Sequence, residues 1–431
     1  MRYSTIDNRL FIENRKRFAG MMESSSVAVF NSNDILPTNA DGQLRLIQNS
    51  DLFYLSGTEQ EESILLLFPD AVDIKMREIL FVREQDAINA IWEGHKLSKV
   101  EASKISGIET ILWLKDFEKV FRGLVLEASQ IYLNTNEHPR AVVETETRDA
   151  RFLAWCRAHF PLHHYKRSAP ILHHLRAIKS DIEVGFIKEA CGITEKGFRR
   201  ILGFIQPGVN EYEIEAELVH EFVRNRSMGF AYTPIIASGS NSCVLHYIDN
   251  DKVCKEGDVI LLDIAAEFAN YKSDMTRVVP VGGKFTPRQK DIYNAVLRVM
   301  RQAIMKLIPG NNMNDYQKEV GGLVEAELIR LGLITAEGVK KQNAESPLYL
   351  KYFMHGTSHH LGLDVHDYGK RSRKFEDGMV FTCEPGIYIP EEGIGVRLEN
   401  NILISGKNPI DLMASIPLEV EEIEDLMQIG K

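Results

Sequence analysis

An internal repeat in the second half of the chain constrains the fold more than any other feature of the sequence. Gly257-Asp-Val-Ile-Leu-Leu-Asp263 matches Gly378-Met-Val-Phe-Thr-Cys-Glu384, with a carboxylate six residues after each glycine. A second carboxylate follows after a predicted turn, Asp274 eleven residues later in the first copy and Glu399 fifteen residues later in the second. The repeat therefore predicts two copies of one β-hairpin, each with two acidic side chains.

Two helical patterns precede each hairpin, separated by a Pro-Gly pair at 207–208 in the first copy and at 309–310 in the second. The Pro-Gly pair stops one helix, and the Asn or Asp that follows it can cap the next. A histidine also lies ahead of each first carboxylate, His246 by 17 residues and His366 by 18. Two copies of helix, helix and hairpin predict a pseudo-twofold domain with a site between its halves.

The positions of the four carboxylates favour metal binding. Asp263 and Glu384 each follow a short apolar run that predicts a strand buried on both faces. Asp274 and Glu399 lie just before two further strand patterns. Burying four carboxylates is costly unless partners or metal neutralise them, and two divalent cations would balance their charge. Oxygen-rich ligation with one imidazole suits Mn²⁺, with Co²⁺, Fe²⁺ and Zn²⁺ as alternatives.

Each carboxylate taken alone has a simpler explanation. Most acidic side chains are solvated, so any one of them could mark a strand end or pair with Arg or Lys. For a single carboxylate we would favour that simpler explanation. For four carboxylates in matched hairpins we favour a metal site instead.

Histidines cluster beside the second hairpin, within His355-Gly-Thr-Ser-His-His-Leu-Gly-Leu-Asp-Val-His-Asp367. His359 is the predicted metal ligand. His355, His366 and His246 are predicted to face the substrate or polarise its carbonyl. A single histidine is more often a surface or satisfied core residue. For that reason no functional role is predicted for His95, His163, His164, His173, His174 and His360.

The first part of the chain predicts a separate α/β domain. Short apolar runs at Ser26–Phe30, Ser63–Phe68 and Glu78–Val82 predict buried strands, and Val143–His159 has helical spacing. Two prolines and a basic cluster at 161–170 indicate a domain junction. We place the boundary near residue 175, which gives an N-terminal α/β domain of 1–175 and a catalytic domain of 176–431.

Composition limits the class of protein. The formal net charge of −10 argues against a nucleic-acid partner. The five cysteines are scattered without C-x-x-C spacing, so neither disulfides nor a zinc knuckle is expected. No apolar run approaches the length of a membrane span, and the N-terminus has charges where a signal peptide would be apolar. These features predict a cytoplasmic protein with no membrane partner.

Several motifs together resemble the pita-bread metallopeptidases, and among them aminopeptidase P (Xaa-Pro aminopeptidase) and prolidase. The motifs are SGSNSCVLHY (Ser238–Tyr247), LLDIAAEFANYKSDMTR (Leu261–Arg277), HGTSHHLGLDVHD (His355–Asp367), EPGIY (Glu384–Tyr388) and GVRLEN (Gly395–Asn400). The likeness covers roughly residues 175–425. Upstream, QNSDLFYLSG (Gln48–Gly57) resembles the N-terminal domain of the same enzymes. The resemblance implies an α/β fold, with a creatinase-type N-terminal domain before a pseudo-twofold pita-bread domain.

The resemblance also implies a role for each matching residue. The metal ligands would be Asp263, Asp274, His359, Glu384 and Glu399, with Asp274 and Glu399 bridging two ions. The other catalytic residues would be His246, His355, His366 and Arg397, and Glu384 would shuttle the proton. A metal-bridged hydroxide would then attack the scissile carbonyl.

The implied activity is removal of the first residue from peptides with proline in second position. Prolidase, which cuts only Xaa-Pro dipeptides, is the alternative within the same chemistry. A non-catalytic pita-bread binding protein and a metal-free creatinase-type hydrolase are less favoured, because all five ligands are retained. A dinuclear phosphoesterase lacks support from any Gly-rich phosphate loop. The resemblance further implies a homodimer or homotetramer.

Overall fold

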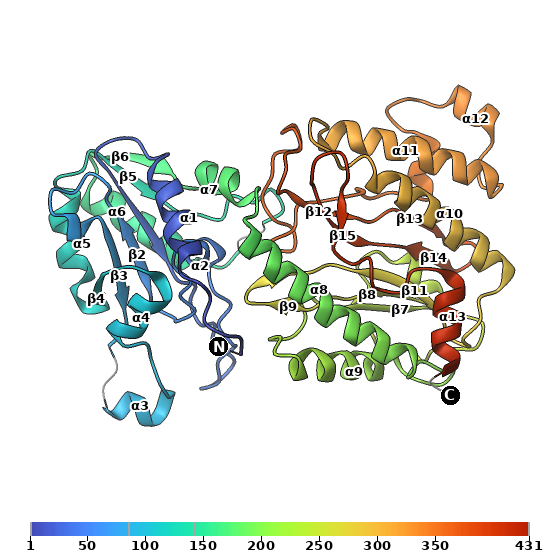
Figure 1. Cartoon of the computed structure of the whole chain (residues 1–431), viewed down its shortest axis with the longest axis horizontal. Helices are drawn as coiled ribbons and strands as arrows, with labels where there is room; N and C mark the ends of the chain where they lie inside the picture. The colour runs from blue at the N-terminus through green and yellow to red at the C-terminus, as the bar shows by residue number, and fades with distance from the viewer. Residues whose placement is uncertain (1, 85–86, 142–143, 430–431) are drawn as a thin grey trace. The chain divides into compact units, whose positions relative to one another are not determined.

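The computed structural model describes residues 2–84, 87–141 and 144–429. The chain divides into two compact units (Figure 1), which are described separately. The N-terminal unit is Ser4–Leu175, and the C-terminal unit is Arg176–Lys431 together with the residues up to Tyr3. Both units mix helices and strands, which confirms the predicted α/β class.

The N-terminal unit is built on one six-stranded sheet with strand order β4-β3-β2-β1-β5-β6. Its strands are β1 (Ser26–Asn31), β2 (Ile64–Leu67), β3 (Glu78–Val82), β4 (Thr110–Trp113), β5 (Gln130–Leu133) and β6 (His164–Arg167). Its helices are α1 (Arg9–Ala19), α2 (Ser50–Ser56), α3 (Ala87–Glu93), α4 (Lys99–Ser106), α5 (Phe117–Val125), α6 (Arg148–His159) and α7 (Ala169–Arg176). Strand β2 runs antiparallel to both of its neighbours, whereas β1, β5 and β6 run parallel to one another.

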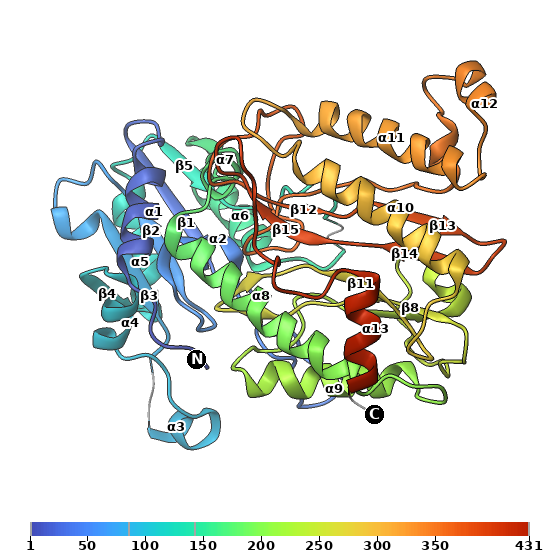
Figure 2. The same ribbon diagram turned by 45° about the vertical axis from the view of Figure 1, so that its right-hand side comes forward.

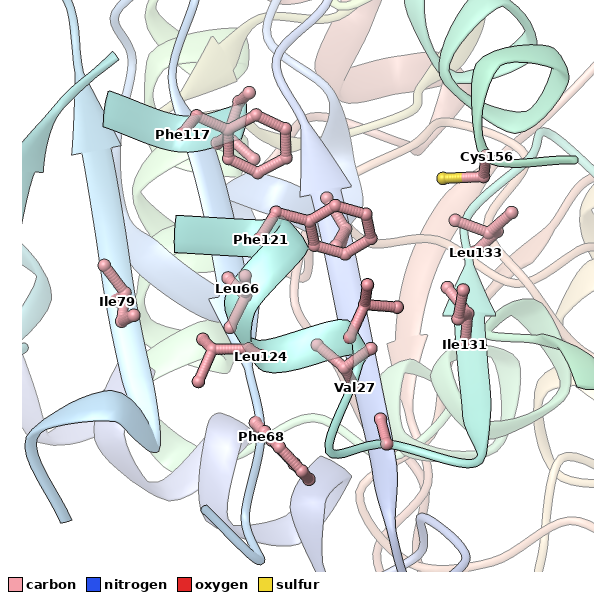
Figure 3. Packing of buried hydrophobic residues seen from close by; sticks show 14 of the residues in the cluster. Val27, Leu66, Phe68, Ile79, Phe117, Phe121, Leu124, Ile131, Leu133 and Cys156 are labelled. Carbon is pink, nitrogen blue, oxygen red and sulfur yellow. The ribbon is translucent and has the colours of Figure 1, made fainter. Parts of the chain in front are cut away.

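The alternation of side chains along β1 explains how both faces of this sheet are buried. On one face, Val27 and Leu66 pack under Phe117 and Phe121 of α5 (Figure 3). On the other face, Phe30 meets Phe18 of α1, with ring centroids 5.2 Å apart. A strand covered on both faces needs a continuous apolar run, as the sequence has here.

The strands predicted in this unit are confirmed as β1, β2 and β3, with ends that differ by at most one residue. The predicted helix begins at Arg148 because the side chain of Thr147 accepts a hydrogen bond from Ala150 N and caps it. Val143, where the prediction started, lies outside the described residues.

The C-terminal unit contains two helix pairs and several short antiparallel strands. Its helices are α8 (Asp181–Leu202), α9 (Glu211–Arg224), α10 (Pro287–Ile304), α11 (Met313–Arg330), α12 (Ala336–Lys341) and α13 (Val420–Ile429). Its strands are β7 (Ile235–Ser238), β8 (Val259–Asp263), β9 (Glu267–Phe268), β10 (Tyr271–Lys272), β11 (Thr276–Pro280), β12 (Val380–Cys383), β13 (Gly386–Ile389), β14 (Ile394–Arg397), β15 (Asn400–Leu403) and β16 (Ile410–Asp411). Helix α8 lies beside α9 and α10 beside α11, with strands between the two pairs (Figures 1 and 2).

The two halves of this unit repeat the same backbone geometry. Gly208 and Gly310 follow the two Pro-Gly prolines with φ of 95° and 94°, values that favour glycine. Gly208 N donates to Cys254 O at 2.9 Å, and Gly310 N donates to Phe375 O at 3.0 Å. Gly257 and Gly378, which begin the two hairpins, have φ of 87° and 85°. The repeat found in the sequence is therefore a structural repeat.

Each hairpin places its two carboxylates at matching ends of paired strands. Asp263 ends β8 and is paired with Thr276 of β11, two residues after Asp274. In the second copy β12 pairs with β15, so that Glu384 directly follows one strand and Glu399 directly precedes the other. Glu399 N donates to Thr276 O at 3.1 Å and joins the two halves.

Residues at the start of the chain pack within the C-terminal unit. An Arg2 guanidinium nitrogen donates to Ser227 O at 2.7 Å, and the ring of Tyr3 lies 5.8 Å from that of Phe268. The five cysteines all lie in described segments and form no disulfide. Among the helices of residues 2–84, 87–141 and 144–429, none is long and apolar enough to cross a membrane.

Candidate metal centre

Three predicted ligands from distant parts of the sequence converge in the C-terminal unit. Asp274, His359 and Glu399 each offer one ligand atom, and these atoms lie within 4.8 Å of one another. His359 Nε2 is 3.4 Å from Asp274 Oδ2 and 3.5 Å from Glu384 Oε1. Three of the predicted carboxylate ligands, Asp274, Glu384 and Glu399, therefore lie close to the His359 ring.

Asp263 is held by two donors. The Tyr232 hydroxyl donates to Asp263 Oδ1 at 2.6 Å, and Arg397 donates to Oδ2 at 2.6 Å. Burial raises the pKa of Asp263, and the charge of Asp274 raises it further. Arg397 thus lies beside the carboxylates.

Glu399 is oriented by a relay that starts at Arg397. Arg397 Nε donates to Thr276 Oγ1 at 3.0 Å, so the Thr276 hydroxyl proton is free to donate to Glu399 Oε2 at 2.7 Å. Arg397 and Glu399 both have less than 5% of their surface exposed. A buried carboxylate with a fixed donor has little freedom to turn, which suits a ligand that must point its oxygens at a small space.

The tautomer of His359 follows from its contacts. His359 Nδ1 is 3.0 Å from the backbone oxygen of His360, which can only accept, so Nδ1 carries the proton. In the neutral ring Nε2 therefore carries the lone pair that a metal ion would bind, whereas in the metal-free site a proton on Nε2 lets it donate to Asp274. A metal-binding histidine commonly donates its other ring nitrogen to a carbonyl in this way.

The electrostatics show how strongly the site needs positive charge. Burial, together with the charges of Asp274, Glu384 and Asp263, raises the pKa of Glu399 well above its usual range. Burial also raises the pKa of Glu384 to about 7 and raises that of Asp263, although Arg397 opposes the shift in both. Arg397 supplies one positive charge against four carboxylates. The oxygen-rich donor set with one imidazole fits divalent cations, which would neutralise the remaining charge.

The other predicted histidines lie at the edge of this cluster. The His355 ring binds Gly356 O through Nδ1 at 2.9 Å and the Tyr388 hydroxyl through Nε2 at 2.8 Å. Burial and the nearby Arg397 lower its pKa to about 3, so it is neutral. The ring of His366 lies 4.0 Å from that of His359, and His246 is exposed.

Several partners of the site could not be identified from the sequence. Tyr232, Thr276 and Tyr388 each bind a predicted site residue through a hydroxyl group. Thr276 and Tyr388 lie within the motifs Leu261–Arg277 and Glu384–Tyr388. Their closeness in sequence to Asp274 and Glu384 is the feature that could have identified them as partners of the site. Tyr232 lies 31 residues before Asp263, and no pattern connects the two.

A buried ion-pair cluster anchors the loop that carries the histidines. Asp367 is 2.7 Å from Arg176 and 3.1 Å from Lys179, and all three side chains are at most 2% exposed. Asp367 N also donates to His360 O at 2.9 Å, the same oxygen that receives His359 Nδ1.

Replacing Asp367 with asparagine should destabilise the protein by about 3 kcal/mol or more, because Lys179 would remain charged and buried without a partner. Urea unfolding would measure the loss. Asp364→Asn is the matched control, since Asp364 also binds Arg176 at 2.6 Å but is 43% exposed, and its loss should cost less than about 1 kcal/mol. Equal effects of the two substitutions would contradict the prediction.

Comparison with known proteins identifies the family. The model of metallopeptidase family M24 matches residues 185–406, and that of the aminopeptidase P N-terminal domain matches residues 11–132. An Xaa-Pro aminopeptidase of Haemophilus influenzae is 33% identical over 97% of this chain and 96% of its own length.

Solved structures agree over the whole chain. Aminopeptidase PepP of Pseudomonas aeruginosa has a TM-score of 0.90 at 31% identity, covering 99% of both chains. Zinc-substituted aminopeptidase P of Escherichia coli, solved in complex with product, has a TM-score of 0.87 at 31% identity and covers 99% of this chain and 100% of that one. The chain therefore belongs to metallopeptidase family M24.

Proposed function

We propose that this metallopeptidase is an Xaa-Pro aminopeptidase, which hydrolyses the N-terminal residue from peptides with proline in second position. The observation that carries the proposal is similarity over nearly the full length of an Xaa-Pro aminopeptidase, 33% identity over 97% of the chain. The convergence of Asp274, His359 and Glu399 supports it, because a metal-dependent peptidase needs such a site.

The proposed ligands are Asp263, Asp274, His359, Glu384 and Glu399. They would hold two divalent ions, most readily Mn²⁺, with Co²⁺, Fe²⁺ or Zn²⁺ as alternatives. When bound, the ions would supply an activated water as nucleophile and positive charge for the oxyanion. The raised pKa values of Glu399 and Glu384 support this assignment, since they reflect burial of the two carboxylates beside other negative charges.

Glu384 is the proposed proton carrier. Its carboxylate lies 3.5 Å from His359 Nε2, inside the proposed metal cluster, where it could pass a proton from the attacking water to the leaving nitrogen. His366, beside His359, is proposed to stabilise the developing oxyanion, and His246 to face the substrate. His355, which is neutral, is proposed to face the substrate or polarise its carbonyl, and Arg397 to hold the carboxylates in place.

Further proposals concern organisation and setting. We assign the N-terminal domain to 1–175 and the catalytic domain to 176–431. The protein is proposed to be cytoplasmic and to form a homodimer or homotetramer, with peptides as partners and neither nucleic acid nor membrane among them.

The test uses the purified protein with Mn²⁺ or with chelator, and an equal mixture of an Xaa-Pro-Xaa tripeptide and an Xaa-Pro dipeptide. We expect metal-dependent release of the first residue from the tripeptide. Mass spectrometry of the products would detect it. A tripeptide with alanine in place of proline is the control and should be cut far more slowly. Cleavage of the dipeptide alone would make the protein a prolidase and overturn the proposal, as would metal binding without cleavage of either peptide.

A further inference from the structure

The backbone of Asp274 is held by a side chain from the other half of the repeat. Asn401 Oδ1 accepts from Asp274 N at 3.1 Å, and Asn401 Nδ2 donates to Asp274 O at 2.6 Å. Asn401 has no exposed surface. Its amide group therefore binds both the donor and the acceptor of one residue, as a neighbouring strand would.

The location of Asp274 explains why such a partner is needed. It lies two residues before β11 begins, where the β8–β11 ladder ends at the pair Asp263 and Thr276. A buried peptide group outside a ladder must find other partners or pay the cost of desolvation. Cys191 of α8 is a third neighbour of the amide, with its sulfur 3.5 Å from Asn401 Oδ1.

The contact is half of a reciprocal arrangement. Asn401 in the second half holds the backbone of Asp274 in the first, and Thr276 in the first half holds the carboxylate of Glu399 in the second. Glu399 is only two residues before Asn401 along the chain. A movement of either hairpin would therefore displace both carboxylates together.

We infer that Asn401 is a positioning residue for Asp274, which sets the distance between Asp274 and Glu399 across the two halves. The inference rests on the proposed function, in which these two carboxylates bridge the metal ions. Groups that orient metal ligands commonly contribute 10- to 100-fold to metal affinity. Asn401 would do so through the backbone of its ligand and without touching metal or substrate.

The test compares Asn401→Ala with Asn250→Ala in the full-length protein. Asn250 is a matched control, since it is 4% exposed, accepts from Ile236 N at 3.0 Å and donates to Pro234 O at 3.0 Å. It has a φ of 47°, so alanine there should cost at least as much stability. Titration of the metal-free proteins with Mn²⁺ by calorimetry should show a loss of affinity of about 10-fold or more for Asn401→Ala alone.

Hydrogen exchange provides a second measurement. The peptide containing Asp274 should exchange its amide hydrogens faster in Asn401→Ala than in Asn250→Ala. Unchanged Mn²⁺ affinity in Asn401→Ala, or an equal loss in the control, would overturn the inference. If Asn401→Ala does not fold, Asn401→Ser replaces it. Failure of both to fold while Asn250→Ala folds would show that Asn401 is needed for folding, which also overturns the inference.

These measurements separate the inference from the proposed function, because metal titration uses no peptide. A wild-type protein that binds Mn²⁺ but cuts no Xaa-Pro peptide would refute the proposed function. The Mn²⁺ affinities of the Asn401→Ala and Asn250→Ala variants would still decide the role of Asn401.

Discussion

Replacing Asp274 with asparagine is expected to reduce peptidase activity by about 10³-fold or more and, at the same time, to make the metal-free protein more stable. The loss of activity follows from the proposed bridging role. Without this carboxylate the two proposed ions would share one ligand fewer, and a 10³-fold fall corresponds to about 4 kcal/mol of transition-state stabilisation.

The gain in stability follows from the charges in the metal-free site. Asp274 is 5% exposed, and its charge raises the pKa values of Glu399, Glu384 and Asp263. Asparagine keeps the shape of the side chain and removes this repulsion. A gain of about 1 kcal/mol would raise Tm by about 1–2 °C in a protein of this size.

Peptide cleavage with Mn²⁺ and thermal unfolding with chelator would test the two parts. Asp291→Asn is the control, because Asp291 is exposed on α10 and should change neither measurement. If Asp274→Asn retained more than a tenth of the activity, the bridging assignment would be wrong. A fall in the Tm of the chelated variant would instead show that hydrogen bonds to Asp274 outweigh the repulsion.

Removing the metal should destabilise the protein increasingly as the pH rises. Without metal, the folded state binds protons at Glu384, Glu399 and Asp263 more tightly than the unfolded chain does, because all three pKa values are raised. Stability must fall with pH wherever the folded state holds more protons. For Glu384 the fall begins near its ordinary pKa of 4.5 and continues to about 7.

His359 contributes in the same direction. Burial lowers its pKa, but the hydrogen bond to Asp274 and the charge of Glu384 outweigh burial and leave it raised. The stability that protonated His359 contributes is therefore also lost as the pH rises through the pKa of His359 in the folded protein. Bound metal reverses the dependence, since cations displace these protons and bind more tightly as pH rises.

Thermal unfolding at pH 5, 6, 7 and 8, with Mn²⁺ or with chelator, measures the effect. We expect the gap in Tm between the two samples to widen between pH 5 and 8, because the lowered pKa of His355 acts in the same direction in both samples. Glu384 alone would account for on the order of 3 kcal/mol of the change. Asp274→Asn should show a smaller dependence. A gap that stays constant across this range would contradict the prediction.

The parts of the fold that could be predicted were those encoded locally. Gly257 and Gly378 mark the starts of two hairpins because their positive φ favours glycine, and the apolar runs after them are strands buried on both faces. Asp263 is the last residue of the first strand, and Glu384 directly follows the second. Each of these features depends on fewer than ten consecutive residues, so the sequence displays them directly.

The contacts that complete the site could not be predicted because they join distant residues. Asn401 is separated from Asp274 by 127 residues, and Thr276 from Glu399 by 123. Neither pair follows a helical or strand period, so no pattern in the sequence connects its members. The strand order of the N-terminal sheet is hidden for the same reason, since β1 pairs with β5 more than a hundred residues later.

The packing of Arg2 and Tyr3 within the C-terminal unit has a consequence for how the chain is assembled. The contact between Arg2 and Ser227 spans 225 residues, and everything from Ser4 to Leu175 lies between its ends. A ribosome releases the chain in order, so these two residues must wait until the whole N-terminal unit has emerged. The N-terminal unit is thus tethered at both of its ends, and a protease that cut only the connection after Leu175 would leave it attached through Arg2 and Tyr3.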